Sequence, residues 1–347
     1  MTFRFKILFM RVAAVTCLWL TAGTLNADVF NGTLYYTLFA GGPNVDKTTF
    51  NYNSTTHVLT YGPQTAVANE FGADGIMFAP NGNLIVTSNA TNNVYRIDAS
   101  TGATLQTVHG TNTDFHMALD PSGNEFYSSD RYTQFAGNLD TFAINANGTF
   151  NDAVGFPITP ASGNDPNVTQ LAFAPNGKIL YTDGSPNGNG DVGLFNLATH
   201  QTTQLLGPTT AAHGVVYDPF TGLWTMFGAG AVATMDPNAG SNAAIAASLM
   251  QRTGINGDFD QGSVDGFGHA LIAGNGDITF IDYSQTHDIT SPLNTVIITA
   301  GFGAIDDVAP LVGLGSQSNT PEPSTLTLLG LGALGLVGYA RRRQRTS

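Results

Sequence analysis

The sequence predicts an all-β fold, a six-bladed β-propeller, and three observations predict it. The chain holds 41 Gly and 16 Pro in 347 residues, which favours short strands joined by tight turns over long helices. One pattern recurs along the chain: an apolar strand, a turn that ends in Gly, and a second apolar strand. The prolines in the turns of its first four copies are 41, 54 and 44 residues apart. Repeats of this length are typical of propeller blades.

The repeat predicts two strands in each blade directly. Its copies lie at residues 75–86, 117–127, 170–181 and 214–224, with a weaker copy without proline at 262–272. In the turn, Pro fixes φ and Gly supplies a positive φ, so the chain reverses between the strands. A third and a fourth strand follow in the first copy, at 93–98 and 104–108.

The length of the chain sets the number of blades. Residues 30–315 comprise 286 residues, about 48 for each of six blades or about 41 for each of seven. A sixth innermost strand is predicted within 306–312, and its outer strands within 33–39, 48–53 and 57–61. Both chain ends then share one blade, which closes the ring and removes its free edges. Six blades are predicted, and seven are the alternative.

The N-terminus has the pattern of a secretory signal peptide over residues 1–27. Three basic residues precede an apolar run, and a small-residue cleavage site follows it, so the mature chain begins near Asp28. The single cysteine, Cys17, lies inside this segment. The exported body therefore contains no cysteine and needs no disulfide. We expect the propeller to occupy residues 28–315 and a linker to follow at 316–320.

The C-terminus has three parts, which together predict a sorting signal over 321–347. Pro321, Glu322 and Pro323 precede an apolar stretch at 324–340 that is just long enough to cross a bilayer. Three arginines then hold that end in the cytoplasm: Arg341, Arg342 and Arg343. The order resembles the PEP-CTERM sorting signal of Gram-negative bacteria that make an extracellular matrix. This resemblance implies processing by an exosortase-type membrane enzyme, and an ordinary single-pass anchor is the alternative.

The charge of the chain excludes nucleic acid as a partner. Residues 28–320 carry 24 acidic and five basic side chains, a net charge of −19. A phosphate backbone is repelled by such a surface.

Two stretches of the body resemble known propeller repeats. Residues 86–102 are similar to the YVTN-type surface-layer repeat, and residues 213–224 are similar to NHL and streptogramin-lyase-like repeats. Both resemblances imply the propeller fold over roughly residues 70–300. They leave the function open, because such repeats occur in binding proteins and in enzymes alike.

Aligning the copies on the turn brings polar residues to the start of each innermost strand, around the mouth of the central channel. These residues are Asp74, Phe115 with His116, Thr169 with Gln170, His213, Asp260 with Gln261, and Asp306 with Asp307. The candidate metal ligands are the carboxylates, which suit Ca²⁺: Asp74, Asp260, Asp306 and Asp307. His116 and His213 are candidates for proton transfer, or for binding a transition metal. Alternatively, the mouth is polar only because water fills it.

The sequence favours a non-enzymatic binding or structural protein, exported and membrane-anchored at least transiently through its C-terminal helix. It would then reach the cell surface or the extracellular matrix, where extracellular polysaccharide or surface proteins are the expected partners. The alternative is a metal-dependent lactonase- or lyase-like enzyme that uses the channel mouth. Gluconolactonase-like propellers hold their ion with a Glu, whereas the only Glu residues of this body, Glu70 and Glu125, lie outside the ring. Calcium is the cofactor that the carboxylates suit best, and the sequence does not establish that any cofactor is bound.

Overall fold

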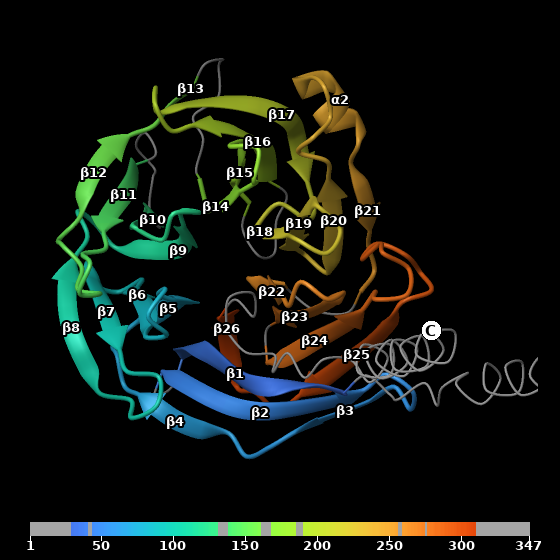
Figure 1. Cartoon of the computed structure of the whole chain (residues 1–347), viewed down its shortest axis with the longest axis horizontal. Coiled ribbons are helices and arrows are strands. Elements are labelled where there is room, and N and C mark those ends of the chain that lie inside the picture. Colours follow the sequence, from blue (N-terminus) through green and yellow to red (C-terminus); the bar gives the residue numbers. More distant parts are fainter. Residues whose placement is uncertain are drawn as a thin grey trace, which may run out of the picture. The chain divides into compact units, whose positions relative to one another are not determined.

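The computed structural model describes residues 29–40, 44–130, 138–160, 168–184, 190–255, 259–274 and 276–309. These residues form six sheets arranged in a ring (Figure 1), antiparallel except for one short parallel pairing, which confirms the six-bladed propeller. The innermost strand of each sheet contacts the innermost strands of its two neighbours all the way round. We number the blades 1 to 6 in the order in which these innermost strands occur in the chain.

Equivalent strands recur in each blade, from the centre of the ring outward. From blade 1 to blade 6, the innermost strands are β5 (Ala73–Phe78), β9 (Asp114–Leu119), β14 (Gln170–Phe173), β18 (Gly214–Asp218), β22 (Gly262–Val264) and β26 (Ala304–Val308). The second strands, in the same order, are β6 (Leu84–Ser88), β10 (Glu125–Asp130), β15 (Ile179–Thr182), β19 (Leu223–Gly228), β23 (His269–Ala273) and β1 (Val29–Ala40).

The third strands are β7 (Asn93–Ile97), β11 (Asn138–Ala143), β16 (Gly190–Asn196), β20 (Ala231–Met235), β24 (Asp277–Asp282) and β2 (Val45–Asn53). The outermost strands are β8 (Thr104–His109), β12 (Val154–Pro157), β17 (Gln201–Thr209), β21 (Met250–Arg252), β25 (Thr295–Ala300) and β3 (Val58–Tyr61). Two short strands extend this pattern, since β4 (Thr65–Ala68) pairs with β2 and β13 (Thr159–Pro160) pairs with β17.

The predicted turns join the first two strands of blades 1 to 4. The glycine of each turn has a positive φ, between 72° and 83°, at Gly82, Gly123, Gly177 and Gly222. Its amide donates to a carbonyl three or four residues earlier, as Gly82 does to Ala79 at 2.9 Å. The turn residues that the sequence repeats are therefore those that the backbone geometry requires.

Blade 6 is built from both ends of the chain, as the sequence predicts. β26 pairs with β1, with Val308 opposite Tyr36 and Ala304 opposite Ala40. β1 in turn pairs with β2 over nine residue pairs. Figure 1 shows these N-terminal strands in blue beside the red C-terminal strand.

The hydrophobic core lies between neighbouring blades. Trp224 of blade 4 is fully buried and packs in one cluster with Leu180 of blade 3. Phe126 of blade 2 packs with Ile85 of blade 1. A strand such as β6 is buried along its whole length because each of its faces meets another blade. Trp224 therefore belongs to the core between blades 3 and 4.

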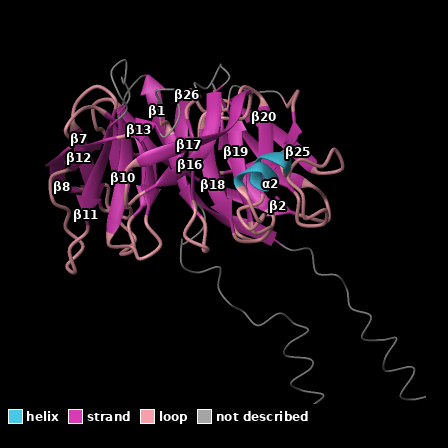
Figure 2. Ribbon diagram, turned by 90° about the horizontal axis from the view of Figure 1, so that it is seen from above, coloured by secondary structure: helices cyan, strands magenta, loops and turns pink. Residues whose placement is uncertain are grey.

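Helices contribute little to the described part of the chain. Strands dominate it, and the short helix α2 (Asn242–Ala247) lies between β20 and β21 (Figure 2). None of the helices in the described ranges is long and apolar enough to span a membrane. The predicted signal peptide at 1–27 and the apolar segment at 324–340 both lie outside the described residues.

Candidate functional site

A repeated hydrogen bond fixes the start of the innermost strands. At four junctions, a hydroxyl from the second strand of one blade donates to the carbonyl just before or at the start of the innermost strand of the next blade. The distances are 2.5 to 2.6 Å for Thr37 to Asp74, Thr87 to Phe115, Ser129 to Thr169, and Thr182 to His213. The acceptor residues are four of the ring positions that the sequence alignment identifies. The predicted register is therefore correct.

These hydrogen bonds need close approach between neighbouring innermost strands, and glycine allows it at two positions. A Cβ atom on Gly75 would lie 2.4 Å from the carbonyl oxygen of Phe115, and one on Gly214 would lie 2.6 Å from that of Asp260. Any larger residue would push the strands apart. The side chains next to these glycines, Asp74 and His213, are thereby held near the centre of the ring.

All six predicted site residues come together at this centre. The four carboxylates and two imidazoles come from five blades: Asp74, His116, His213, Asp260, Asp306 and Asp307. Asp74 and His116 are 1% exposed and Asp307 is fully buried. The side chain of Asp260 is 13% exposed, which makes it the member of the cluster nearest to solvent. We call these six residues the central cluster.

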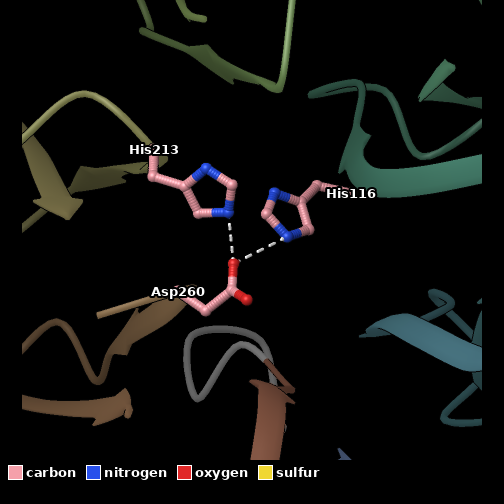
Figure 3. A group of neighbouring side chains, drawn as sticks. All are labelled: His116, His213 and Asp260. Carbon is pink, nitrogen blue, oxygen red and sulfur yellow. Dashed lines mark ion pairs between the residues drawn. The ribbon is translucent and has the colours of Figure 1, made fainter. Parts of the chain in front are cut away.

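Asp260 joins the two histidines (Figure 3). Its Oδ1 atom forms an ion pair with Nε2 of His213 and lies 3.2 Å from Nε2 of His116. The two imidazole rings meet edge to face, with centroids 4.8 Å apart. Phe115 stacks on the ring of His116 at 4.1 Å, which limits the rotation of that side chain.

The backbone fixes the tautomer of His213. Its Nδ1 atom lies 2.5 Å from the carbonyl oxygen of Gly184, which can only accept a hydrogen bond. Nδ1 therefore carries a proton, and Nε2 faces Asp260. The same backbone–histidine contact is common where histidine binds a metal, because it orients the ring and raises its basicity.

The remaining carboxylates lie on the side of His116. Oδ1 of Asp307 is 3.3 Å from Nε2 of His116, and Asp74 belongs to the same group of possible ligands. Asn89 donates from its side-chain amide to Oδ2 of Asp74. Asn89 was not a predicted site residue, although it comes two residues after Thr87, at the end of β6 that faces the cluster.

Burial changes the proton affinity of the cluster. It raises the pKa of Asp74 to about 6 and that of Asp307 to about 7. Burial also raises the pKa of Asp306 well above its usual range, with the charges of Asp74 and Asp260 adding to the effect. Although burial opposes it, contact with Asp307 and Asp260 holds the pKa of His116 well above its ordinary value. The pKa of Asp260 is lowered despite burial, because His213 and His116 favour its charged form.

Many polar atoms of this region lack a hydrogen bond. Among the described residues, nine such side-chain atoms are buried without a partner of hydrogen-bond geometry: Asp74 Oδ1, both ring nitrogens of His116, His213 Nε2, Asp260 Oδ1, Gln261 Oε1, Asp306 Oδ2 and both oxygens of Asp307. Buried polar groups are normally satisfied, and each one left unpaired is unfavourable. The members of this cluster are enclosed by the inner ends of the blades, and Asp260 is the most exposed of them.

The other histidines divide into two groups. In the sequence, none of the five histidines outside the cluster has a partner at a recognisable spacing, which predicts turn or surface positions for all five. His57, His200 and His287 lie in turns with φ between 52° and 54°, and His109 lies on the surface, as predicted. His269 was expected in a turn or on the surface, and that expectation is wrong. It is buried in β23, where its Nδ1 atom lies 2.7 Å from Oδ2 of Asp265.

Comparison with protein families identifies the C-terminal segment. Residues 319–344 match the PEP-CTERM protein-sorting motif, which confirms the predicted sorting signal. The motif indicates a secreted surface protein that is processed by an exosortase. No curated protein matches the chain.

Solved structures share the fold of the body at low sequence identity. A chain of the nidogen/laminin complex is 11% identical, covers 81% of this chain and 98% of its own, and has a TM-score of 0.56. The PQQ-bound aldose sugar dehydrogenase of Streptomyces coelicolor is 13% identical, with 82% and 90% covered and a TM-score of 0.50. Virginiamycin B lyase of Staphylococcus aureus is 11% identical, with 79% and 88% covered and a TM-score of 0.46. The chain is thus an exported six-bladed propeller with a PEP-CTERM sorting signal.

Proposed function

We propose that this chain is a non-enzymatic binding or structural protein of the cell surface, delivered there by its two terminal signals. Residues 1–27 direct export, and the motif at 319–344 directs sorting and processing. The propeller at 28–315 is then presented outside the cell, with extracellular polysaccharide or surface proteins as its partners. Association with the extracellular matrix is part of this proposal.

One observation supports a non-enzymatic role best. The groups of the central cluster that could transfer protons are enclosed: His116 and His213 are each 1% exposed. A general acid or base must come within hydrogen-bond distance of its substrate. Side chains so deeply buried are poorly placed to contact a substrate at the surface of the ring.

The experiment is co-sedimentation of the purified full-length chain with the extracellular matrix fraction of the producing cells. We expect the chain to sediment with the matrix, and His116→Gln to sediment equally well if the variant is folded. Failure of the chain to sediment with the matrix, or equal sedimentation of an unrelated acidic protein of similar size, would contradict a specific matrix role.

The second candidate is a lactonase- or lyase-like enzyme, and one observation favours it. Asp260 is partly exposed and contacts both imidazoles, so it links the surface to His116 and His213. A substrate at Asp260 could exchange a proton with this pair. Turnover of a lactone that is lost in Asp260→Asn, with the fold intact, would favour this candidate over the first.

A further inference from the structure

The central cluster has the composition and geometry of a metal-binding site of a specific kind. Two imidazole nitrogens and a carboxylate oxygen meet around one point: Nε2 of His116, Nε2 of His213 and Oδ1 of Asp260. These three atoms lie within 4.8 Å of one another. With ligand bonds of about 2.0 to 2.1 Å, two ligands of a tetrahedral ion are about 3.4 Å apart. The 3.2 Å between His116 and Asp260 is close to this separation, whereas the contact between His213 and Asp260 is shorter and would lengthen when an ion binds.

The contact between His213 and Asp260 requires a positive charge. Because Nδ1 of His213 donates to the Gly184 carbonyl, the second ring nitrogen presents its lone pair to the carboxylate when the ring is neutral. Two acceptors repel each other unless a proton or a metal ion lies between them. The composition of the cluster suits a cation as well, since its carboxylates outnumber its imidazoles by four to two.

The buried polar atoms of the cluster that lack a hydrogen bond also favour a bound cation. His116 is 1% exposed, and neither of its ring nitrogens has a hydrogen bond of good geometry within the described ranges. Oδ1 of Asp307 is fully buried, likewise unpaired, and 3.3 Å from Nε2 of His116. A metal ion bonded to Nε2 of His116 would provide a partner for several of these atoms at once. A single water molecule, which forms two to four hydrogen bonds, would satisfy them less completely.

The geometry allows one ion rather than two. The contacts of His116 with Asp260 and with Asp307 both involve its Nε2 atom. An imidazole nitrogen has one lone pair and binds one metal. The group formed by Asp74, His116 and Asp307 shares His116 with the group formed by His116, His213 and Asp260, and Asp307 approaches the same ring nitrogen as Asp260.

We propose that the central cluster binds one divalent transition-metal ion, of the zinc or iron(II) class, through His116, His213 and Asp260. Asp307 is the nearest further carboxylate and balances the charge of the ion. Calcium is a poor match, because it takes six to eight oxygen ligands whereas imidazole suits transition metals. This assigns His116 and His213 as metal ligands rather than proton-transfer groups.

The inference does not depend on the proposed surface role, since an ion at this position joins blades 2, 4 and 5 in either function. Asp260 is the proposed ligand with the most exposed side chain, although its Oδ1 atom is buried. The contact of His213 with the Gly184 carbonyl extends the centre to blade 3, because that carbonyl follows β15.

The test measures metal bound by the full-length chain in mild detergent, after removal of metals with a chelator and dialysis against Zn²⁺, Co²⁺ or Ca²⁺ alone. We expect one Zn²⁺ or Co²⁺ per chain and no stoichiometric Ca²⁺. X-ray absorption at the zinc edge should show two imidazole nitrogens at about 2.0 to 2.1 Å. Stoichiometric calcium, or zinc with no imidazole ligand, would overturn the assignment.

Variants locate the ion. His116→Gln and His213→Gln should each weaken zinc binding by about 100-fold or more, the upper end of what loss of an outer-shell partner costs. The matched control is His269→Gln, because His269 is also buried beside a carboxylate but belongs to neither group of possible ligands. It should bind one Zn²⁺ with unchanged affinity. Unchanged binding in both cluster variants, or no zinc bound by the folded parent chain, would refute the proposal.

Discussion

The hydroxyl of Tyr52 donates a 2.7 Å hydrogen bond to Oδ2 of Asp282, a residue 230 positions later in the chain. Tyr52 lies in β2 of blade 6 and Asp282 ends β24 of blade 5. Beside this pair, the ring of Phe30 stacks on His269 at 4.6 Å. The junction between the blade closed by the N-terminal strands and the blade before it thus depends on a small buried polar network.

Replacing Tyr52 by Phe should lower the free energy of unfolding by about 1 to 3 kcal/mol, because it leaves a buried acceptor on Asp282 unpaired. Thermal or chemical denaturation measures the change. Tyr127→Phe is the matched control: its hydroxyl donates to Glu125, which is exposed and can bind water instead. We expect a smaller loss there, and equal losses in the two variants would show that the junction has no special role.

The hydrogen bond between Tyr52 and Asp282 also predicts that the stability of the fold depends on pH. Although burial opposes it, hydrogen bonds from Ser284 and Tyr52 lower the pKa of Asp282 below its ordinary value of 3.8. A lowered pKa in the folded state contributes stability above pH 3.8, and this contribution is lost as the pH falls through the folded-state pKa. The Asp282→Asn variant should therefore be less stable than the parent chain at pH 7, and the difference should be smaller at a pH below 3.8. Urea titrations at the two pH values test this, and a difference independent of pH would contradict it.

Two buried threonine hydroxyls, one that links neighbouring blades and one that does not, allow a matched comparison of stability. Thr182→Val removes the donor to the His213 carbonyl, so we expect unfolding to become easier by about 1 to 3 kcal/mol. Thr225 is also fully buried in a second strand, but its hydroxyl has no hydrogen-bond partner among the described residues. Thr225→Val should be neutral or stabilising, since it removes an unsatisfied polar atom. The prediction fails if melting temperatures change alike in both variants.

The C-terminal segment predicts where the protein is found. Deleting residues 321–347 removes most of the matched sorting motif and should release the propeller from the membrane fraction. Neutral replacement of Arg341, Arg342 and Arg343 should impair retention or processing, because the positive charges that hold this end in the cytoplasm are lost. Cell fractionation and the size of the mature chain report both effects. Unchanged location and size in both variants would argue against sorting by this segment.

The fold was predictable because its information is local and repeated. A turn such as that around Gly82 is determined by a few adjacent residues, so its copies can be recognised without knowledge of the fold. Alignment of the copies then placed His116, His213 and the four aspartates at equivalent positions. Since equivalent positions in a ring face the same axis, their meeting at the centre followed from the register alone.

The chemistry of the site was less predictable because it depends on distant contacts. The sequence does not show that Gly184 is the partner of His213, or that Phe115 packs on His116, because these contacts depend on how adjacent blades pack. The burial of His269 was missed for the same reason. Its environment is made by Phe30 and Tyr52 from the opposite end of the chain.

Pairing between Tyr36 and Val308 also sets an order of events for folding. One edge of β1 stays unpaired until almost the entire body has been synthesised and exported. Such long-range pairing slows folding and exposes strand edges to aggregation in the meantime. Only ten residues, 309–318, separate β26 from the sorting motif. The strand that completes the ring is therefore followed at once by the signal that directs processing. A chain truncated just before that signal contains the closing strand β26 with only a few residues to spare.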